Sequence, residues 1–347
     1  MSSEEPAPTI FDVADLASVS VSTVSRVING RADVSPATRS RVEAAIGRLS
    51  FAPQVTAQRL AGRRSHTVAM LFPSAYAQRS NHDLDFVLGA AEATSGRDYF
   101  FNVASDPLDG PRMRSMFRSG LVEGAILMQI TAQDWRVDLA AREQLPCVLI
   151  GRTDTEHPLS WVDFDFAGAV GSMVDHLVVT GHRQIGFVGR SHAMLDAGLG
   201  AAIRLRRGHE QAVLRHGLEL HHVASDLDPL AAGQAALHLV DSVEGLSAVV
   251  ATHGPSALGM LRALRSRGLR VPEDVSLLTV ATSRVAELSM PSLSGTDFPS
   301  AQLGFQAASM LVRQLDDRAR GVAPRTEQIL MPARLSVRET SAPVRAV

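Results

Sequence analysis

A short run of hydroxyl and arginine side chains near the N-terminus could make many hydrogen bonds at one surface. Val24, Val27 and Ile28 follow helical spacing, so the other residues of the run must face outward. The outward-facing residues are Val21, Ser22, Arg26 and Asn29. Arginine can donate two hydrogen bonds to guanine, serine can bond to several base edges, and valine can pack on a thymine methyl group. We therefore expect Val21, Ser22 and Arg26 to enter the major groove of DNA and set its sequence preference.

A second group of short polar side chains lies near the predicted helix ends and is better suited to phosphate oxygens. These residues are Ser20, Thr23, Asn29 and Thr38. Phosphate contacts fix the register of a protein on DNA but carry little sequence information. The alternative is that Ser20 only caps a helix and Arg26 is only a solvated surface residue. The context of the run favours the DNA interpretation.

The other candidate residues for chemistry do not form a catalytic or metal-binding pattern. The chain has 12 histidines but no Gly-x-Ser-x-Gly, His-Glu-x-x-His or phosphate-loop motif. His216, His221 and His222 follow a predicted helix end without nearby thiols, which is typical of solvated histidines. The single cysteine, Cys147, is expected to be a small buried hydrophobic residue. We therefore expect no enzyme, no metal and no cofactor.

Three short amphipathic segments must position the polar run. They are Ile10–Ala17, Val21–Ile28 and a segment that contains Val42–Leu49. Ser20 suits the cap of the second segment, and Ser35 followed by Pro36 suits the start of the third. Only residues 18–20 separate the first two, a length that turns one helix across another. Residues 9–53 are therefore predicted to be a helix-turn-helix domain with the second segment as its reading helix.

Strand-like and helical segments alternate through the rest of the chain. The expected strands are Thr67–Phe72, Tyr99–Val103, Ala125–Met128, Val148–Ile150, Ile185–Val188, Ala248–Ala251 and Val275–Val280. The expected helices lie near 84–95, 207–216 and 256–267. This alternation predicts parallel sheets in two α/β lobes. Residues 54–65, before the first strand, are predicted to be a linker with helical potential.

Composition limits where a nucleic acid could bind. The 347 residues are 45% hydrophobic and 20% charged, with a net charge of −2, so any DNA contact must come from a local patch. Residues 1–8 are acidic and contain proline, which predicts a disordered tail rather than an export signal. No apolar stretch is long enough to suggest a membrane span. A cytoplasmic protein is the expectation.

The segment Asp12–Asn29 closely resembles the helix-turn-helix of the LacI/GalR family, the lactose- and purine-repressor type of bacterial regulator. Residues 181–183 (Gly-His-Arg), 257–259 (Ala-Leu-Gly) and 271–276 (Val-Pro-Glu-Asp-Val-Ser) resemble landmarks of the family's sensor module, in the same order. The resemblance covers essentially the whole chain after Pro8. It implies an N-terminal all-α helix-turn-helix domain followed by an α/β two-lobe periplasmic-binding-protein-like core.

The resemblance also implies how that core is divided. Three strand crossovers would join the lobes, with a ligand cleft between them and dimerisation along residues 66–340. On the family pattern the first lobe holds about 66–165 and 296–325, the second lobe holds 166–295 and 326–340, and residues 341–347 form a tail.

A hinge is implied for residues 54–65. In the family this linker folds as a helix on the operator, and a leucine from each subunit wedges into the minor groove. Ala57 and Leu60 occupy the matching positions here. The alternative is that Leu60 only packs on the core.

The expected ligand cleft departs from the family pattern. The usual arginine falls on Leu205, with Arg204 and Arg206 as neighbours, and the usual Asn-Asp and Asp are replaced by 253–254 (His-Gly) and Ala281. Asp165 matches a family position, where it could bind ligand or cap a helix. The expected lining is Tyr76, Phe86, Asp165, Arg204, Arg206 and His253. Because unpaired buried polar groups are costly, a cleft short of acceptors suits something other than a simple pentose or hexose. An apolar or unusual effector and the absence of any effector both stay open.

These features together predict a regulator that binds double-stranded DNA. A homodimer would place two reading helices about one DNA turn apart on a near-palindromic operator. Tetrameric relatives add a leucine-heptad helix, whereas residues 338–347 are too short and polar for a coiled coil. A repressor is the expectation, with operator affinity controlled by a small molecule. A transport or chemoreception protein would share the two lobes but needs an export signal and no reading helix.

Overall fold

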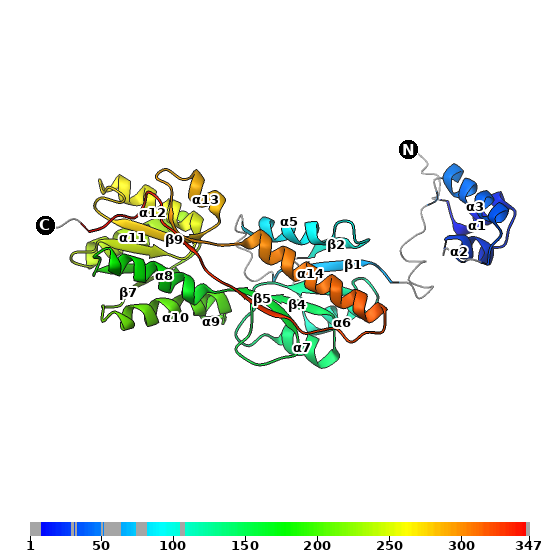
Figure 1. The fold of residues 1–347 in the computed structure, drawn as a ribbon, viewed down its shortest axis with the longest axis horizontal. Helices are drawn as coiled ribbons and strands as arrows, with labels where there is room; N and C mark the ends of the chain where they lie inside the picture. The colour runs from blue at the N-terminus through cyan, green and yellow to red at the C-terminus, as the bar shows by residue number, and fades with distance from the viewer. Residues whose placement is uncertain are drawn as a thin grey trace, which may run out of the picture. The chain divides into compact units, whose positions relative to one another are not determined.

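The computed structural model describes residues 8–28, 31, 33–49, 51, 64–73, 82–104 and 108–344. The chain divides into a small unit that ends at Ser65 and a larger unit that begins at His66. Both units are drawn in Figure 1. Each has its own hydrophobic core.

Three helices form the small unit, as the sequence predicts. They are α1 (Ile10–Ala17), α2 (Val21–Ile28) and α3 (Pro36–Leu49). Thr9 and Asp12 form a capping box at the start of α1, since each side chain accepts a hydrogen bond from the other's backbone N–H. Ser18 ends the helix in the left-handed region, at φ 52°. A tight turn therefore leads directly into α2.

The core of the small unit takes small apolar side chains from all three helices and the ring of Phe51, which follows α3. Its buried members are Val13, Ala14, Ala17, Val24, Val27, Val42, Ala45 and Phe51. The predicted spacing of apolar residues explains this core, because each helix turns one stripe inward.

The first lobe of the larger unit is built on a parallel six-stranded sheet in the order β11-β5-β4-β3-β1-β2. The strands are β1 (Thr67–Leu71), β2 (Phe100–Ala104), β3 (Gly124–Leu127), β4 (Cys147–Ile150), β5 (Ser160–Phe164) and β11 (Gln328–Met331). Side chains alternate along β1: Val68 and Met70 join one core, and Ala69 and Leu71 join another. Both faces of the sheet are therefore covered.

Four helices cover these two faces. Helices α5 (His82–Thr94) and α14 (Ser300–Ala319) pack on one side, and α6 (Gly110–Arg118) and α7 (Trp135–Glu143) pack on the other. Figure 1 shows α5 and α14 side by side. A Cβ on Gly304 would lie 2.1 Å from the carbonyl oxygen of Phe86. Gly304 therefore allows α14 to lie close to the backbone of α5 at Phe86, which holds Phe86 in position.

The second lobe repeats this architecture, with the strand order β12-β10-β9-β8-β6-β7. The strands are β6 (Ile185–Arg190), β7 (His221–Ser225), β8 (Ala248–Ala251), β9 (Ser276–Ala281), β10 (Ser294–Asp297) and β12 (Leu335–Ser336), of which only β12 pairs antiparallel. The main helices are α8 (Phe166–Val179), α10 (Gly200–Arg215), α11 (Pro229–Ser242) and α12 (Gly254–Ser266), with short helices α9 (His192–Asp196) and α13 (Ser283–Leu288). Helices α8 and α10 share one core, and α11 and α12 share the other. The α10 helix begins seven residues earlier than the sequence suggests.

Three connections cross between the lobes, from β5 to α8, from β10 to α14 and from β11 to β12. The predicted boundary at residue 326 is wrong, because β11 pairs with β5 in the first lobe. The predicted C-terminal tail is also too long. Residues 341–344 bind the second lobe, where the carbonyl of Ala342 lies 3.0 Å from Nε2 of His182 and Val344 donates to Thr180.

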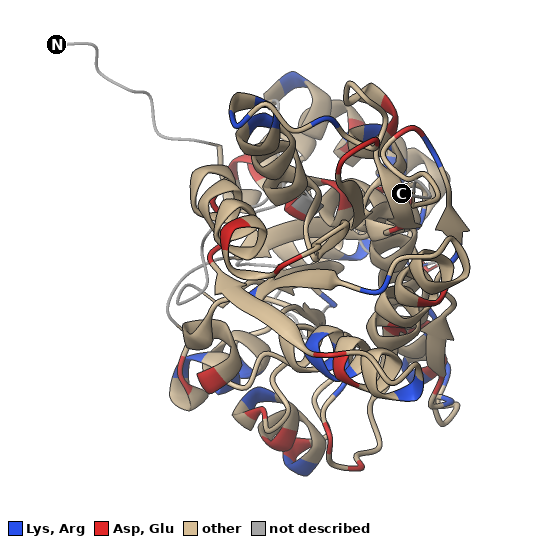
Figure 2. Cartoon of the chain, turned by 90° about the vertical axis from the view of Figure 1, so that its left-hand side faces the viewer, with Lys and Arg blue, Asp and Glu red and all other residues tan. Residues whose placement is uncertain are grey.

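Charged side chains in the larger unit lie mainly on its outer helices and loops (Figure 2). No helix in the described part of the chain is long and apolar enough to cross a membrane.

Candidate DNA-reading helix and ligand pocket

Ser20 organises the start of α2. Its Oγ accepts a hydrogen bond from the backbone N–H of Thr23 at 3.2 Å and lies 2.8 Å from the hydroxyl oxygens of both Ser22 and Thr23. The serine therefore caps the helix and ties two other predicted contact residues together.

The opposite faces of α2 differ sharply in burial. Val24 and Val27 are buried in the core, whereas Ser22 and Arg26 are exposed. Val21 is half-buried against the same core, so only part of its surface can meet DNA. The guanidinium of Arg26 lies 3.8 Å from the carboxylate of Asp33, and both side chains are 60% exposed. An exposed pair of this kind is weak and leaves Arg26 able to bind another acceptor.

Arg39 is a supporting residue that the sequence analysis missed. It extends from α3 and donates to the carbonyl oxygens of Val27 at 3.4 Å and Arg31 at 2.6 Å. These bonds hold the segment after α2, where helix carbonyls lack partners. At the start of α3, Thr38 donates its backbone N–H to Ser35 at 3.3 Å.

Three predicted DNA contacts, Asn29, Ala57 and Leu60, lie outside the described residues, as does most of the predicted hinge 54–65. Their roles stay predictions.

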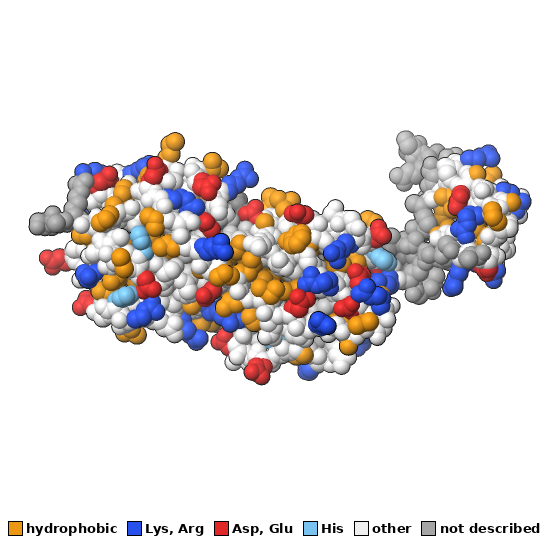
Figure 3. Space-filling model, in the orientation of Figure 1, with side chains coloured by type: hydrophobic (Ala, Val, Ile, Leu, Met, Phe, Trp, Pro, Cys, Tyr) orange, Lys and Arg blue, Asp and Glu red, His pale blue; other side chains and the backbone are white. Residues whose placement is uncertain are grey.

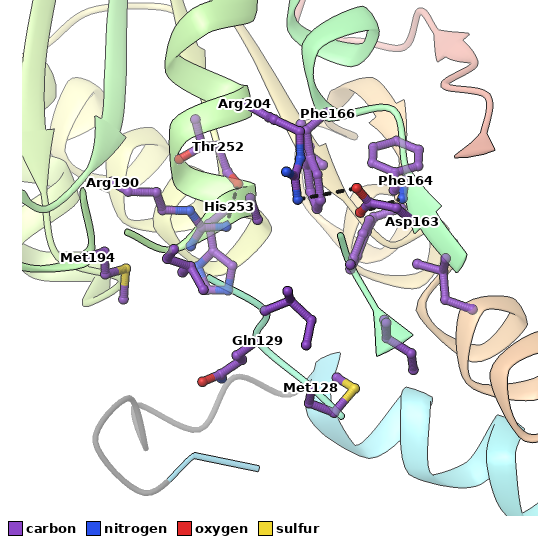
Figure 4. A pocket seen from close by; sticks show the side chains of 18 of the residues that line it. Met128, Gln129, Asp163, Phe164, Phe166, Arg190, Met194, Arg204, Thr252 and His253 are labelled. Atoms are coloured by element: carbon purple, nitrogen blue, oxygen red, sulfur yellow. Dashed lines mark hydrogen bonds and ion pairs between the residues drawn. The ribbon is translucent and has the colours of Figure 1, made fainter. Parts of the chain in front are cut away.

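A cavity of about 160 Å³ lies between the two lobes of the larger unit (Figure 4). The first lobe lines it from α5 and from the ends of β3, β4 and β5, and the second lobe lines it from β6, α10 and the start of α12. Ligands of α/β proteins commonly bind at the carboxyl ends of parallel strands. The position of the cavity suits a small molecule.

Phenylalanine side chains form one wall of this pocket. They are Phe86, Phe164, Phe166 and Phe298. The rings of Phe164 and Phe298 meet edge to face with centroids 5.3 Å apart, and the rings of Phe86 and Phe298 do so at 5.8 Å. Edge-to-face packing fixes the wall while leaving ring surface toward the cavity.

Asp163 and Arg204 form a buried ion pair in the pocket, shown by the dashed line in Figure 4. Arg204 Nη2 and Arg152 Nε each lie 3.2 Å from Oδ2 of Asp163, which is 3% exposed. The backbone N–H of Phe164 donates to its other oxygen at 2.9 Å. Burial raises the pKa of Asp163, and the two guanidinium groups offset part of that rise. Burial likewise lowers the pKa of Arg204, which Asp163 partly restores.

Arg190 ends β6 and reaches the same pocket. Its Nη2 donates to the carbonyl oxygen of Thr252 at 3.1 Å, and it forms no ion pair with a carboxylate in the described part of the chain. Burial lowers the pKa of Arg190 to about 10. Nearby, Nδ1 of His253 lies 3.2 Å from the hydroxyl of Ser256.

The structure brings three of the predicted lining residues together: Phe86, Arg204 and His253. Two others do not line the pocket. Asp165 caps α8, the alternative that the sequence left open, by accepting from the N–H of Gly168 at 2.9 Å. The prediction for Arg206 is wrong, because this residue is exposed and pairs with Glu210.

Tyr76 lies outside the described residues. Asp163 and Arg190 were missed. Both lie at the carboxyl ends of strands, which was the available signal.

The three histidines predicted to be solvated are half-buried instead. His216 lies 2.6 Å from a carboxylate oxygen of Asp175, and His221 lies 2.7 Å from the amide oxygen of Gln184. His222 packs against the ring of Phe187 at 5.4 Å. These contacts are structural.

Comparisons with known proteins agree with both units. The family of bacterial regulatory proteins of the lacI type matches residues 9–54, and the periplasmic binding protein-like domain matches residues 174–341. The HTH-type transcriptional regulator CelR of Thermobifida fusca is 31% identical, covering 96% of this chain and 98% of that protein. Catabolite control protein A of Staphylococcus xylosus is 25% identical, covering 96% and 99%.

Two solved structures are similar over nearly the whole chain. A complex of CelR with cellobiose has 28% identity and a TM-score of 0.67, covering 96% of this chain and all (100%) of that one. The lac repressor dimer bound to operator and the anti-inducer ONPF has 22% identity and a TM-score of 0.82, covering 96% and 99%. At 22% identity, the likeness to the lac repressor shows the fold alone.

A helix-turn-helix unit followed by two α/β lobes with a pocket between them defines a DNA-binding transcriptional regulator with an effector-binding module. The chain belongs to the LacI family of such regulators. Members of this family regulate transcription and are not enzymes.

Proposed function

We propose that the chain binds a near-palindromic operator as a homodimer and represses transcription from it. Helix α2 would lie in the major groove, with Ser22, Arg26 and the exposed part of Val21 at base edges. The observation that carries this proposal is the exposure of Ser22 and Arg26 opposite the buried Val24 and Val27.

Phosphate contacts would complete this interface. Ser20, Thr23, Asn29 and Thr38 would fix the register on the backbone, and Ala57 and Leu60 would contact the minor groove. Support for the first group comes from the hydroxyls of Ser20 and Thr23, which lie together at the start of α2.

Exposed apolar side chains on the first lobe support a dimer. Leu84 and Leu88 on α5 are 59% and 57% exposed, and Phe100 on the edge strand β2 is 72% exposed. Figure 3 shows hydrophobic side chains at the surface over α5. Exposed apolar edges of sheets tend to be covered in solution. We assign this α5–β2 face to the dimer interface.

The pocket would hold the effector and control the operator affinity. The walls of the pocket come from both lobes, so a ligand can bind one arrangement of the lobes more tightly than another. Such a ligand shifts the populations of the two arrangements. The relative CelR has been solved with cellobiose, which supports a ligand at the corresponding module.

Selection of binding sites from random DNA tests the reading mode. A dimer that reads with two copies of α2 selects inverted half-sites whose centres lie about 10 base pairs apart. Recovery of single, unrepeated sites would contradict the proposal.

The dimer face is tested by Leu84→Glu combined with Leu88→Glu and analytical ultracentrifugation. This double variant should shift the protein to a monomer. Leu214→Glu, at a leucine that is 68% exposed on α10, is the control and should leave the dimer intact. A dimer that survives both changes would place the interface elsewhere.

A further inference from the structure

We propose that the pocket takes a single-ring carboxylate, whose apolar ring lies against the phenylalanine wall and whose anionic group binds Arg190. This inference rests on the proposed function, in which the pocket is the effector site. It adds the chemical class of that effector.

Arg190 is the cation in the pocket whose charge is not balanced. Arg204 is paired with Asp163 at 3.2 Å, whereas Arg190 donates to a single backbone carbonyl, that of Thr252 at 3.1 Å. Within the described residues no carboxylate forms an ion pair with it. A desolvated cation without an anion is unfavourable, and a ligand carboxylate would offset this through charge-assisted hydrogen bonds. The lowered pKa of Arg190 reflects the same desolvation.

The size and lining of the cavity favour one apolar ring. Its volume is about 160 Å³. An apolar cavity of roughly 150 Å³ accommodates benzene, so one apolar ring fits the volume of this pocket. Met128 and Ile150 add apolar surface opposite the second lobe.

The remaining polar groups offer a sugar few partners. Asp163 and Arg204 pair with each other, and Nδ1 of His253 is within hydrogen-bond distance of Ser256. Gln129 Oε1 and Arg204 Nε are buried pocket atoms that accept or donate no hydrogen bond within the described residues. A bound hexose would need partners for several hydroxyls, and each buried group left unpaired costs about 1–3 kcal/mol. A carboxylate on a ring needs one cationic partner.

Asp83, in the first turn of α5, is the second carboxylate that lines the pocket. It belongs to the first lobe, whereas Arg190 belongs to the second. A neutral or cationic ligand would use Asp83, and an anionic ligand would be repelled by it. Substitution of each residue therefore tests the charge of the ligand, since Arg190 favours an anionic ligand and Asp83 disfavours one.

Isothermal titration of the full chain with benzoate and its neutral isostere benzamide tests the proposal. Benzoate should bind at least about tenfold more tightly, since hydrogen bonds to charged groups are the stronger ones. Arg190→Met should abolish this preference without lowering the melting temperature of the unliganded protein. Arg206→Met, an exposed arginine outside the pocket, should keep the preference. Asp83→Asn should leave benzoate binding unchanged or strengthen it.

Several results would overturn the assignment. These are equal binding of benzoate and benzamide, tighter binding of glucose or cellobiose, weaker benzoate binding by Asp83→Asn, or no binding by any of these probes. Operator binding is measured on the same samples. If it is retained while the ligand result fails, the ligand class is wrong and the DNA-reading function stands.

Discussion

The DNA-reading surface and the ligand pocket are built in opposite ways. The reading residues from Ser20 to Arg26 lie within one helix and its cap, and the most polar of them are exposed. The pocket residues come from strands and helices between Asp83 and Leu303, and its central ion pair is buried. One surface is a property of a local segment. The other exists only after two lobes have assembled.

Because of this difference, substitutions in the two regions should affect DNA binding and folding stability separately. A side chain on the exposed face of α2 contacts little of its own protein, so its replacement should change DNA binding alone. Replacement of a partner in the buried Asp163–Arg204 ion pair should change the stability of the larger unit as well as ligand binding. Variants in the two regions should therefore fail in different assays.

The largest expected effect is that of Arg26→Ala on DNA binding. Loss of a bidentate contact to guanine costs about 1–3 kcal/mol per half-site, and a dimer loses it twice. Specific operator binding should be abolished in a gel-shift titration, while effector binding and the melting temperature stay as in the parent.

Arg41→Ala is the matched control, since it removes the same charge from an exposed position on α3. This variant should weaken binding to operator and to random DNA alike and preserve the ratio of the two affinities. An unchanged operator affinity in Arg26→Ala would remove this residue from the reading surface.

Arg204→Met should destabilise the larger unit by about 3 kcal/mol, because it leaves a buried carboxylate short of one partner. Both tryptophans, Trp135 and Trp161, belong to this unit, so urea denaturation followed by their fluorescence reports on it. Burial already raises the pKa of Asp163, and loss of Arg204 should raise it further.

The pH dependence of this loss has a definite sign. A carboxyl group with a raised pKa binds its proton more tightly in the folded state, so the folded state gains stability as the pH falls through that pKa. The deficit of Arg204→Met should be fully present well above the raised pKa of Asp163 and shrink as the pH falls through it. Arg206→Met, which breaks only an exposed pair, should show neither the deficit nor its pH dependence. A deficit that grows in acid would contradict the role of Asp163.

Ser20→Ala should weaken α2 by about 1 kcal/mol, because it removes the cap. Hydrogen exchange of the α2 amides should speed up roughly fivefold, while the larger unit keeps its protection. Ser22→Ala is the control, because Ser22 accepts no backbone N–H in the described part of the chain. If both variants exchange alike, Ser20 acts through its hydroxyl contacts and not as a cap.

The sequence predicted the small unit well because local patterns determine it. The spacing of Val24 and Val27, the cap at Ser20 and the short turn before α2 are all visible within a dozen residues. Arg39 escaped notice because its partners lie across a turn, at Val27 and Arg31.

The pocket could be predicted only in part. Arg204 and Arg206 flank Leu205 on one helix, and which of them meets the pocket depends on how α10 packs against its neighbours. Asp163 and Asp165 are similarly close in sequence. The structure places the first at the end of a buried strand and the second at a helix cap.

The end of the chain shows a similar limit. Strand β11 has only four residues and lies near the last crossover. Its sequence does not indicate which sheet it joins. Pairing with β5 in three dimensions decides this.

The smallest expected effect is that of Asp33→Asn, which tests whether Arg26 is held or free before DNA binds. The pair at 3.8 Å is exposed, so its loss costs less than about 1 kcal/mol. Without this carboxylate, Arg26 does not have to give up its contact with Asp33 to bind DNA, and a negative charge near the phosphates is removed.

The affinity of the Asp33→Asn variant should rise about twofold for operator and random duplexes alike, and the gain should fade at high salt. Fluorescence anisotropy at two salt concentrations measures this, with Asp15→Asn on α1 as the control for charge alone. A loss of operator affinity with random DNA unaffected would mean instead that Asp33 orients Arg26 toward its base, so that part of the reading geometry lies in the loop after α2.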